Sequence, residues 1–489
     1  MQKLKMGYEL KAIKVLFKNF KNLEFDNIEL LPSSGSYRQY YRIKSCENSY
    51  IAAYNKDKKE NIAFLGFTKT FLKLGLKVPE IYAENIENNV YLLQDLGDTT
   101  LLKYLSGSNI QKNLAAGNID IYKKVIEQLP LFQIGGGKEI DYSICYPRNA
   151  FDKQSMMWDL NYFKYYFLKL AKVPFDEQHL ENDFQAFNNF LLGADCNFFL
   201  YRDFQSRNVM IVKDEPYFID YQGGRRGALQ YDIASILFEA KTSLDSKTRE
   251  ILLDHYLKTL SKHTKIDEKL FLKYYYGYVY IRLMQAMGAY GFRGLYEKKE
   301  LFLQSIPKSL EHLKWLRMNV KLPVSLPELE KVWDSLVTSE HVKHLLPEKI
   351  NVTVCINSFS YRKGIPNDKT SNGGGFVFDC RLLNNPGKLD MFKALTGLDS
   401  PVTEYLDEDP KVAVFLENVF NIIDQTVEAY DFKNYSNLMV SFGCTGGQHR
   451  SVYAAEKLAA HLSKKYNGMN VNLRHREIGN VNSDSRSLS

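Results

Sequence analysis

The sequence predicts two domains, a larger α+β domain and a smaller α/β domain, and three features support this. Residues 198–220 place a polar loop between short apolar runs that read as strands. Three prolines between residues 318 and 347 interrupt the pattern, and the strand–helix alternation typical of α/β units follows. In that later part, a glycine-containing loop joins an apolar strand to a helix. We expect a first domain over 1–318, a linker with a short helix over 319–348, and a second domain over 349–489.

The length and composition are those of a globular protein with more than one hydrophobic core. The chain has 489 residues, of which 45% are hydrophobic and 25% are charged. A net charge of +7 is mild at this length and allows anionic ligands or RNA without requiring them. The six cysteines form no CxxC pair, the first residues contain no apolar signal core, and no apolar run is long enough to span a membrane. We expect a cytoplasmic protein with reduced thiols and no membrane contact, and self-association is left open.

The pattern along the first domain predicts a strand-rich part followed by helices. We expect helices over 8–20, 62–74, 155–172, 180–192 and much of 270–316, and strands over 40–43, 50–54 and 90–97. A loop of small residues, Ser34-Gly35-Ser36, precedes the first of these strands. In the amino lobe of a kinase such a loop covers the phosphates of the nucleotide, although most Ser/Gly loops between strands are ordinary turns.

Residues 203–220 carry the groups that magnesium-dependent phosphoryl transfer requires. Asp203 can accept the proton of an acceptor hydroxyl. Asn208 offers a neutral oxygen to a magnesium ion, and Asp220, after the next apolar run, offers an anionic one. A hairpin from 209–212 to 217–220, turning at 213–216, would bring Asp220 back beside Asn208. The alternative is chance polar loop residues, and the apolar strands on both sides argue against it.

Residues 10–318 resemble the aminoglycoside phosphotransferase-like kinases. The likeness lies in the runs 36–42, 92–98, 201–210, 219–223 and 227–235. It extends to AmgK-type kinases, which phosphorylate the anomeric hydroxyl of N-acetylmuramate and N-acetylglucosamine. The resemblance implies a two-lobed, protein-kinase-like fold, ATP and Mg²⁺ as cofactors, an aminosugar substrate, and Asp232 as a brace of the catalytic loop. The nucleotide site implied comprises Ser34, Gly35, Ser36, Arg38, Arg42, Gln94, Asp95 and Leu96.

Two positions depart from the pattern of these kinases. The histidine expected two residues before the catalytic aspartate is Tyr201, and the strand 50–54 has no lysine to grip the nucleotide phosphates. Arg38 or Arg42 could replace that lysine, because a guanidinium suits bidentate phosphate contact. Both arginines could also be solvent-facing strand residues. The chain is therefore either an active kinase or a non-catalytic relative that binds a nucleotide.

The second domain contains a loop suited to a phosphate group. Residues 438–443 read as a buried strand, and a helix follows Ser451. The intervening loop directs backbone N–H groups and the helix dipole at an anion. The spacing from Cys444 to Arg450 also matches the C-x5-R pattern of cysteine phosphatases, with Cys444 as the nucleophile and Asp399 or Asp379 as the candidate acid.

Residues 350–476 resemble the C-terminal domain of RapZ-type RNase adapter proteins. The likeness lies in the runs 358–366, 375–386, 396–402, 443–453 and 473–476. In that family the domain senses glucosamine-6-phosphate and contacts a small RNA, which implies a phosphosugar ligand here. The first domain departs from that family, because the sequence contains no G-x4-G-K-S/T motif. The anion site implied comprises Arg381, Cys444, Thr445, Gly446, Gly447, His449, Arg450 and Ser451.

These features favour an ATP-dependent aminosugar kinase joined to a domain that binds a phosphorylated aminosugar. A non-catalytic nucleotide-binding protein, an RNA adapter and a phosphatase are the alternatives.

Overall fold

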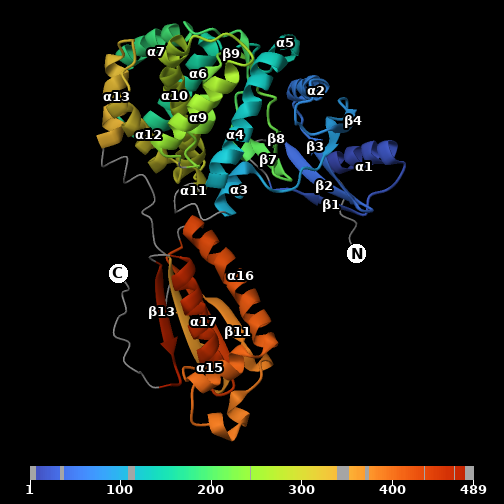
Figure 1. The fold of residues 1–489 in the computed structure, drawn as a ribbon, viewed down its shortest axis with the longest axis vertical. Helices are drawn as coiled ribbons and strands as arrows, with labels where there is room; N and C mark the ends of the chain where they lie inside the picture. Colours follow the sequence, from blue (N-terminus) through green and yellow to red (C-terminus); the bar gives the residue numbers. More distant parts are fainter. Residues whose placement is uncertain are drawn as a thin grey trace. The chain divides into compact units, whose positions relative to one another are not determined.

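The chain folds into two units, Met1–Leu346 and Pro347–Ser489, each with its own hydrophobic core (Figure 1). The structure is a computed structural model. It describes residues 7–32, 38–107, 116–242, 244–338, 352–368, 374–433, 435–466 and 469–478.

The first unit begins with a five-stranded antiparallel sheet of order β1-β2-β3-β5-β4. Its strands are β1 (Asn27–Leu30), β2 (Gln39–Ser45), β3 (Asn48–Tyr54), β4 (Ile81–Asn85) and β5 (Val90–Gln94). Alternate side chains point to opposite faces. Ala52 and Leu92 pack in one cluster with α1 (Tyr8–Lys21), whereas Ala53 and Tyr91 pack in another with α2 (Lys58–Lys73). Both faces are therefore covered by a helix.

The rest of the first unit is mainly helical and encloses two small antiparallel strand pairs, β6 with β9 and β7 with β8. The strands are β6 (Phe198–Leu200), β7 (Val209–Val212), β8 (Glu215–Phe218) and β9 (Arg225–Gly227). The helices are α3 (Leu101–Gly107), α4 (Ala116–Pro130), α5 (Gly137–Glu139), α6 (Lys153–Phe163), α7 (Glu177–Leu191), α8 (Gln230–Leu237), α9 (Ser246–Leu260), α10 (Glu268–Tyr290), α11 (Glu300–Leu303), α12 (Ile306–Asn319) and α13 (Pro327–Thr338). A sheet lobe followed by a helical lobe confirms the predicted two-lobed, kinase-like fold.

Helix α13 corrects the predicted linker over 319–348. The short helix is present, but it is part of the first unit's core. Trp333 is 1% exposed and stacks on Tyr280 of α10, with ring centroids 4.1 Å apart. Asp183 of α7 accepts the backbone N–H groups of Glu328 and Leu329 at 2.7 and 2.8 Å, and so satisfies the start of the helix. Residues 339–348 lie outside the described part of the chain.

The second unit is built on a four-stranded parallel sheet of order β11-β12-β10-β13. The strands are β10 (Thr353–Ser360), β11 (Gly375–Asp379), β12 (Asn437–Cys444) and β13 (Asn470–His475), and the helices are α15 (Ser400–Asp407), α16 (Pro410–Lys433) and α17 (Arg450–Lys465). Helix α17 packs on β10, β12 and β13, and α16 packs against α17. The connections leave β10 and β12 toward opposite edges, which in parallel sheets marks the carboxyl ends of the two strands as the usual ligand position. The predicted α/β domain is confirmed.

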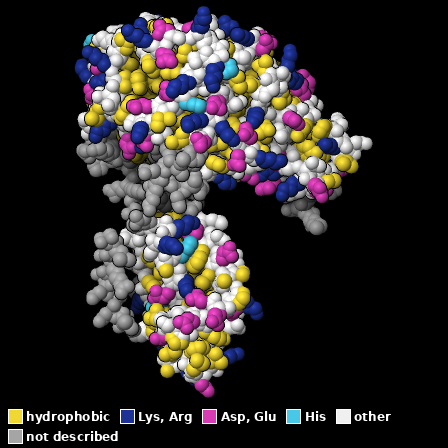
Figure 2. All heavy atoms as spheres, in the orientation of Figure 1, with side chains coloured by type: hydrophobic (Ala, Val, Ile, Leu, Met, Phe, Trp, Pro, Cys, Tyr) yellow, Lys and Arg dark blue, Asp and Glu magenta, His cyan; other side chains and the backbone are white. Residues whose placement is uncertain are grey.

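Charged side chains are mixed over the surface in view. Figure 2 shows Lys and Arg interspersed with Asp and Glu on the visible face of the first unit, and hydrophobic side chains gathered at one end of the second unit. Among the described helices, none combines the length and apolar character needed to cross a bilayer.

A buried histidine gives the first unit a predicted acid sensitivity. His312 is 2% exposed, and its Nδ1 lies 3.3 Å from Arg249 Nη1, which donates to it. Burial, helped by Arg249, lowers the pKa of His312 from 6.5 to about 3. The unfolded chain therefore takes up this proton below about pH 6.5 while the folded chain does not. Stability is full above that pH and falls by up to about 1.4 kcal/mol per pH unit below it.

Urea unfolding between about pH 5 and 8 tests this prediction, with fluorescence as the probe because Trp158, Trp315 and Trp333 all belong to the first unit. His312→Gln should flatten the acid limb, and His263→Gln, at an exposed histidine, should not. Equal slopes in the wild type and His312→Gln would contradict the assignment.

Candidate active site

The loop that follows β6 holds Asp203 and Asn208 together. The side-chain Nδ2 of Asn208 donates to the backbone carbonyl of Asp203 at 2.8 Å. That bond fixes the amide plane and leaves Oδ1 as the atom of Asn208 that can coordinate a cation. Gln205 Nε2 donates to Asp203 Oδ1 at 3.2 Å. The aspartate and asparagine are thus positioned by the loop itself.

The β7–β8 hairpin brings Asp220 beside this loop. Its turn is Lys213-Asp214, both with positive φ (49° and 61°), so the predicted turn over 213–216 is two residues shorter and β8 starts at Glu215. After β8, the N–H of Ile219 donates to the carbonyl of Asn208 at 3.0 Å. Asp220 follows with φ 68°, a left-handed conformation that is strained for a residue other than glycine. The hairpin therefore brings Asp220 beside Asn208, as the spacing of the two residues predicts.

The residues present fit a magnesium ion. Burial raises the pKa of Asp220, and the negative charge of Asp203 adds to that effect, while Gln222 Nε2 donates to Asp220 Oδ1 at 2.7 Å. Two neighbouring carboxylates and an oriented amide oxygen form a hard-oxygen donor set that a divalent cation would stabilise. Among the described residues, no three His, Cys, Asp or Glu side chains form a metal cluster. The ion would accordingly need further oxygens from water or phosphate, as Mg²⁺ usually does.

Asp232 of α8 binds the backbone just before Asp203. Its two carboxylate oxygens accept the successive backbone N–H groups of Tyr201 and Arg202 at 2.8 and 3.0 Å. Burial raises the pKa of Asp232 to about 7, against the two N–H groups, which lower it. Arg202 has φ 79°, and its guanidinium binds both oxygens of Asp159 at 2.6 and 2.8 Å. The bracing role expected for Asp232 agrees with this geometry.

Tyr201, at the position of the expected histidine, is buried and hydrogen-bonded. Its side chain is 1% exposed, and its hydroxyl donates to the carbonyl of Ile219 at 2.6 Å. Burial raises the pKa of this phenol well above its usual value, so it stays a neutral donor. Tyr201 therefore links the segment before Asp203 to the segment before Asp220.

Arg38, the other candidate for the phosphate clamp, is buried against α2. Its Nη2 pairs with Glu60 Oε1 of α2 at 3.1 Å, and its side chain is 1% exposed. Its positive charge lowers the pKa of Asp220, which places it on the metal side of the site. In kinases the strand lysine pairs with a glutamate of the following helix, and the Arg38–Glu60 pair has the same form. Glu60 is not among the predicted site residues, although its place in the helix after the strands is a usable signal.

Arg42 is not available as the phosphate clamp. Its guanidinium donates to both carboxylate oxygens of Asp95 at 2.7 and 3.1 Å, and to Asp98 at 2.9 and 3.0 Å. Asp95 also accepts the hydroxyl of Ser49. The Arg42 and Asp95 side chains thus brace the end of β5, and the nucleotide contacts of both residues stay predictions. Gln94 and Leu96 border the same segment, and the predicted loop residues Ser34, Gly35 and Ser36 lie outside the described residues.

In the second unit, the loop from Cys444 to Ser451 joins the carboxyl end of β12 to α17. Cys444 Sγ accepts the N–H of Gly447 at 3.2 Å and lies 3.2 Å from Ser451 Oγ. Ser360 Oγ, at the end of β10, donates to the carbonyl of Thr445 at 2.7 Å. Thr445 and Gly446 are exposed, and the first-turn N–H groups of α17 have no carbonyl partner within the helix. The loop thus exposes Thr445 and Gly446 at the expected ligand position, just before the start of α17.

Three predicted members of the anion site have other contacts. Arg450 Nη1 donates to the carbonyls of Arg381 and Leu383 at 3.2 and 2.9 Å. His449 Nε2 lies 2.9 Å from the carbonyl of Phe392, and Arg381 is paired with Asp379. Backbone carbonyls bind Arg450 and His449, and the carboxylate of Asp379 binds Arg381. These side chains therefore support or flank the loop.

The phosphatase alternative does not fit this geometry. Cys444 is 3% exposed and its sulfur is part of the loop's internal hydrogen bonding. The arginine of the C-x5-R pattern, Arg450, binds backbone carbonyls instead of facing the loop. Asp379 is paired with Arg381, and Asp399 accepts the N–H of Thr396 at 2.6 Å, so neither candidate acid is free.

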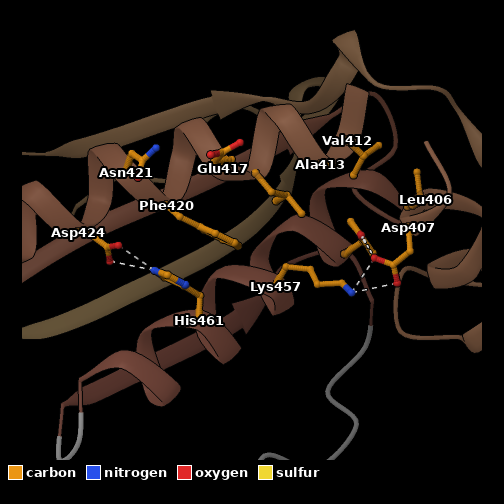
Figure 3. Close-up of a pocket in the computed structure, with 12 residues that line it drawn as sticks. Leu406, Asp407, Val412, Ala413, Glu417, Phe420, Asn421, Asp424, Lys457 and His461 are labelled. Atoms are coloured by element: carbon orange, nitrogen blue, oxygen red, sulfur yellow. Dashed lines mark hydrogen bonds and ion pairs between the residues drawn. The ribbon is translucent and has the colours of Figure 1, made fainter. Parts of the chain in front are cut away.

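A separate hollow of about 450 Å³ lies between α16 and α17 (Figure 3). His461 pairs with Asp424 at 3.0 Å, and its ring stacks on Phe420 with centroids 4.2 Å apart. Lys457 pairs with Asp407 at 2.8 Å. The cations that line this hollow already face carboxylates, so it is a poorer phosphate site than the loop.

The second unit is similar to a known domain family. Residues 352–479 match the family described as the RapZ C-terminal domain. Curated relatives include a nucleotide-binding protein of Acidovorax sp. strain JS42, 36% identical over 183 residues, which is 36% of this chain and 60% of the relative. A nucleotide-binding protein of Shewanella oneidensis is 38% identical over 146 residues, 29% of this chain and 49% of the relative. The chain thus spans about half to three fifths of the length of these relatives.

Solved structures similar to the chain include two small-molecule kinases. The choline kinase LicA of Streptococcus pneumoniae aligns with a TM-score of 0.42 and 17% identity, covering 64% of this chain and 100% of that one. An ethanolamine kinase of Plasmodium vivax aligns with a TM-score of 0.44 and 12% identity, covering 62% and 86%. At such identities the likeness concerns the course of the chain and not the ligand.

Replacing Asp232 by Asn should destabilise the first unit. One acceptor oxygen becomes an NH₂ group facing a buried backbone N–H, and an unsatisfied buried donor costs about 1–3 kcal/mol. The free energy of unfolding, measured with urea and tryptophan fluorescence, should fall by about that amount. Asp254→Asn, at an exposed carboxylate of α9, should change it by less than about 0.5 kcal/mol. Equal stabilities of the two variants would show that Asp232 does not brace the loop.

Proposed function

We propose that the first unit transfers a phosphoryl group from ATP to a hydroxyl of an aminosugar with the help of Mg²⁺. The observation that carries the proposal is the convergence of Asp203, Asn208 and Asp220 through the Asn208–Asp203 bond and the β7–β8 hairpin. A base and two oxygen ligands in one place are the parts that phosphoryl transfer asks of a protein.

Each residue has a distinct part in this proposal. Asp203 accepts the proton of the sugar hydroxyl as that oxygen attacks phosphorus, and Gln205 orients its carboxylate. Asn208 Oδ1 and the Asp220 carboxylate would hold Mg²⁺, which when bound neutralises charge on the transferred phosphate. Arg38, held by Glu60, supplies a fixed positive charge on the same side. Tyr201 and Asp232 keep the loop in place without touching the substrate.

Turnover by the full chain tests the proposal. With Mg·ATP and N-acetylmuramate or N-acetylglucosamine, the wild type should form a sugar phosphate, and chelation of Mg²⁺ should abolish the reaction. Asp203→Asn should lower kcat by about 100-fold or more, because the proton acceptor is lost. Asp214→Asn, in the exposed hairpin turn, should retain wild-type kcat.

An unchanged kcat in Asp203→Asn would exclude the assigned base. Binding of Mg·ATP without turnover of either sugar would instead favour the non-catalytic nucleotide-binding function.

For the second unit we propose a phosphorylated aminosugar as ligand of the loop from Cys444 to Ser451. The match of residues 352–479 to the RapZ C-terminal domain and the exposed position of Thr445 and Gly446 before a helix N-terminus support this choice. The loop contributes mainly backbone donors and the hydroxyl of Thr445, since Arg381, His449 and Arg450 are held elsewhere.

Calorimetric titration of the full chain with glucosamine 6-phosphate tests the loop. Thr445→Val should weaken binding about 5- to 20-fold through the loss of one hydrogen bond to a charged group. Asp390→Asn, at a residue whose side chain is 92% exposed, should leave the affinity unchanged. Equal affinities in Thr445→Val and the wild type would remove Thr445 from the site. RNA binding with a steep salt dependence, and no sugar-phosphate binding, would favour the RNA-adapter function instead.

A further inference from the structure

A second buried arginine near the loop after β6, Arg225, forms no ion pair among the described residues. Arg225 opens β9 and is 6% exposed. Among the described residues, its one hydrogen bond runs from Nε to the carbonyl of Gly223 at 3.0 Å, and no carboxylate lies within ion-pair distance of it. By contrast Arg202, which is also largely buried, is fully paired with Asp159. A buried cation with a single neutral partner is unfavourable unless a ligand completes it.

The position of Arg225 is beside the catalytic base. In the β6–β9 pair it lies opposite Leu200, three residues before Asp203. Its hydrogen-bond partner Gly223 is also close to the base, because a Cβ at that glycine would lie 3.8 Å from Asp203 Oδ2. Burial and the charge of Arg202 lower the pKa of Arg225 to about 10, while Asp159, Tyr231 and Asp203 act in the opposite sense. The charged groups that act on Arg225 are thus Arg202, Asp159 and Asp203, together with the phenol of Tyr231.

The donor phosphates have a different set of neighbours. Asn208 and Asp220 stand on the β7–β8 side, and the charges of Arg38 and Arg207 act on Asp220. Arg225 instead bonds to Gly223, which lies beside Asp203 Oδ2, and its charge interacts with that of Asp203. We propose that Arg225 forms a subsite for an anionic group of the acceptor, a carboxylate or a phosphate, so that the sugar presented to Asp203 is negatively charged. This rests on the proposed function and makes anionic acceptors its preferred substrates.

Three acceptors separate the alternatives with the full chain at saturating Mg·ATP. N-acetylglucosamine is neutral, N-acetylmuramate carries a carboxylate, and N-acetylglucosamine 6-phosphate carries a phosphate. At least one anionic acceptor should have a kcat/KM about tenfold or more above that of the neutral sugar. The preferred anion identifies the source of the charge.

Arg225→Gln should lower kcat/KM for the preferred anionic acceptor by about 10- to 100-fold, leave N-acetylglucosamine within about twofold, and leave the KM for ATP unchanged. Arg225→Lys should restore part of the loss, because it keeps the charge without the fork of donors. Arg226→Gln is the matched control, since the neighbouring Arg226 is exposed and stacks on the ring of Tyr142 at 4.4 Å. It should behave like the wild type.

Equal use of neutral and anionic acceptors by the wild type would overturn the inference. A raised KM for ATP in Arg225→Gln would overturn it too, since Arg225 would then bind the donor. If no sugar is phosphorylated, the proposed function fails. Calorimetric binding of the same three sugars to the wild type and Arg225→Lys, with a non-hydrolysable ATP analogue and Mg²⁺, then decides whether the anion subsite exists.

Discussion

Two adjacent backbone N–H groups, those of Tyr201 and Arg202, depend on the single carboxylate of Asp232. Arg202 is held at φ 79°, a conformation that costs about 1–2 kcal/mol for a residue with a side chain. The conformation persists because Asp232 takes the N–H groups and Asp159 takes the guanidinium. The next residue is Asp203, so the direction of the base is set by contacts made before the loop begins.

The second half of the site is held in the same indirect way. Asp220 is also in a left-handed conformation, and the hydroxyl of Tyr201 reaches the carbonyl just before it. One tyrosine therefore connects the strained base segment with the strained metal segment. Burial raises the pKa of this phenol well above its usual value, so it stays a neutral donor and the link does not change with pH near neutrality.

Much of the fold and the convergence of the candidate site residues could be predicted because their signals are local. Asp203, Asn208 and Asp220 lie within one stretch, and strand spacing alone brings them together. The partners Glu60 and Asp159 are distant from Arg38 and Arg202 in the sequence, and only the tertiary structure shows which charges meet. The amphipathic pattern of 327–338 predicts helix α13 but does not show which unit the helix packs against. For Arg381, His449 and Arg450, the motif predicted the loop but not the direction of the side chains, which carbonyls and a carboxylate decide.

The two neighbouring glycines of the second unit's loop differ in what they permit. Gly446 has open space where a side chain would begin. Gly447 has φ 72°, and a Cβ there would overlap Glu477 and the backbone of β10 at Phe359 and Ser360. In a library that randomises both codons, position 446 would accept many residues and position 447 almost none. A new side chain at position 446 would therefore point into open space, while the packing of Gly447 on β10 stays unchanged. Position 446 is accordingly the one at which to change what the loop contacts.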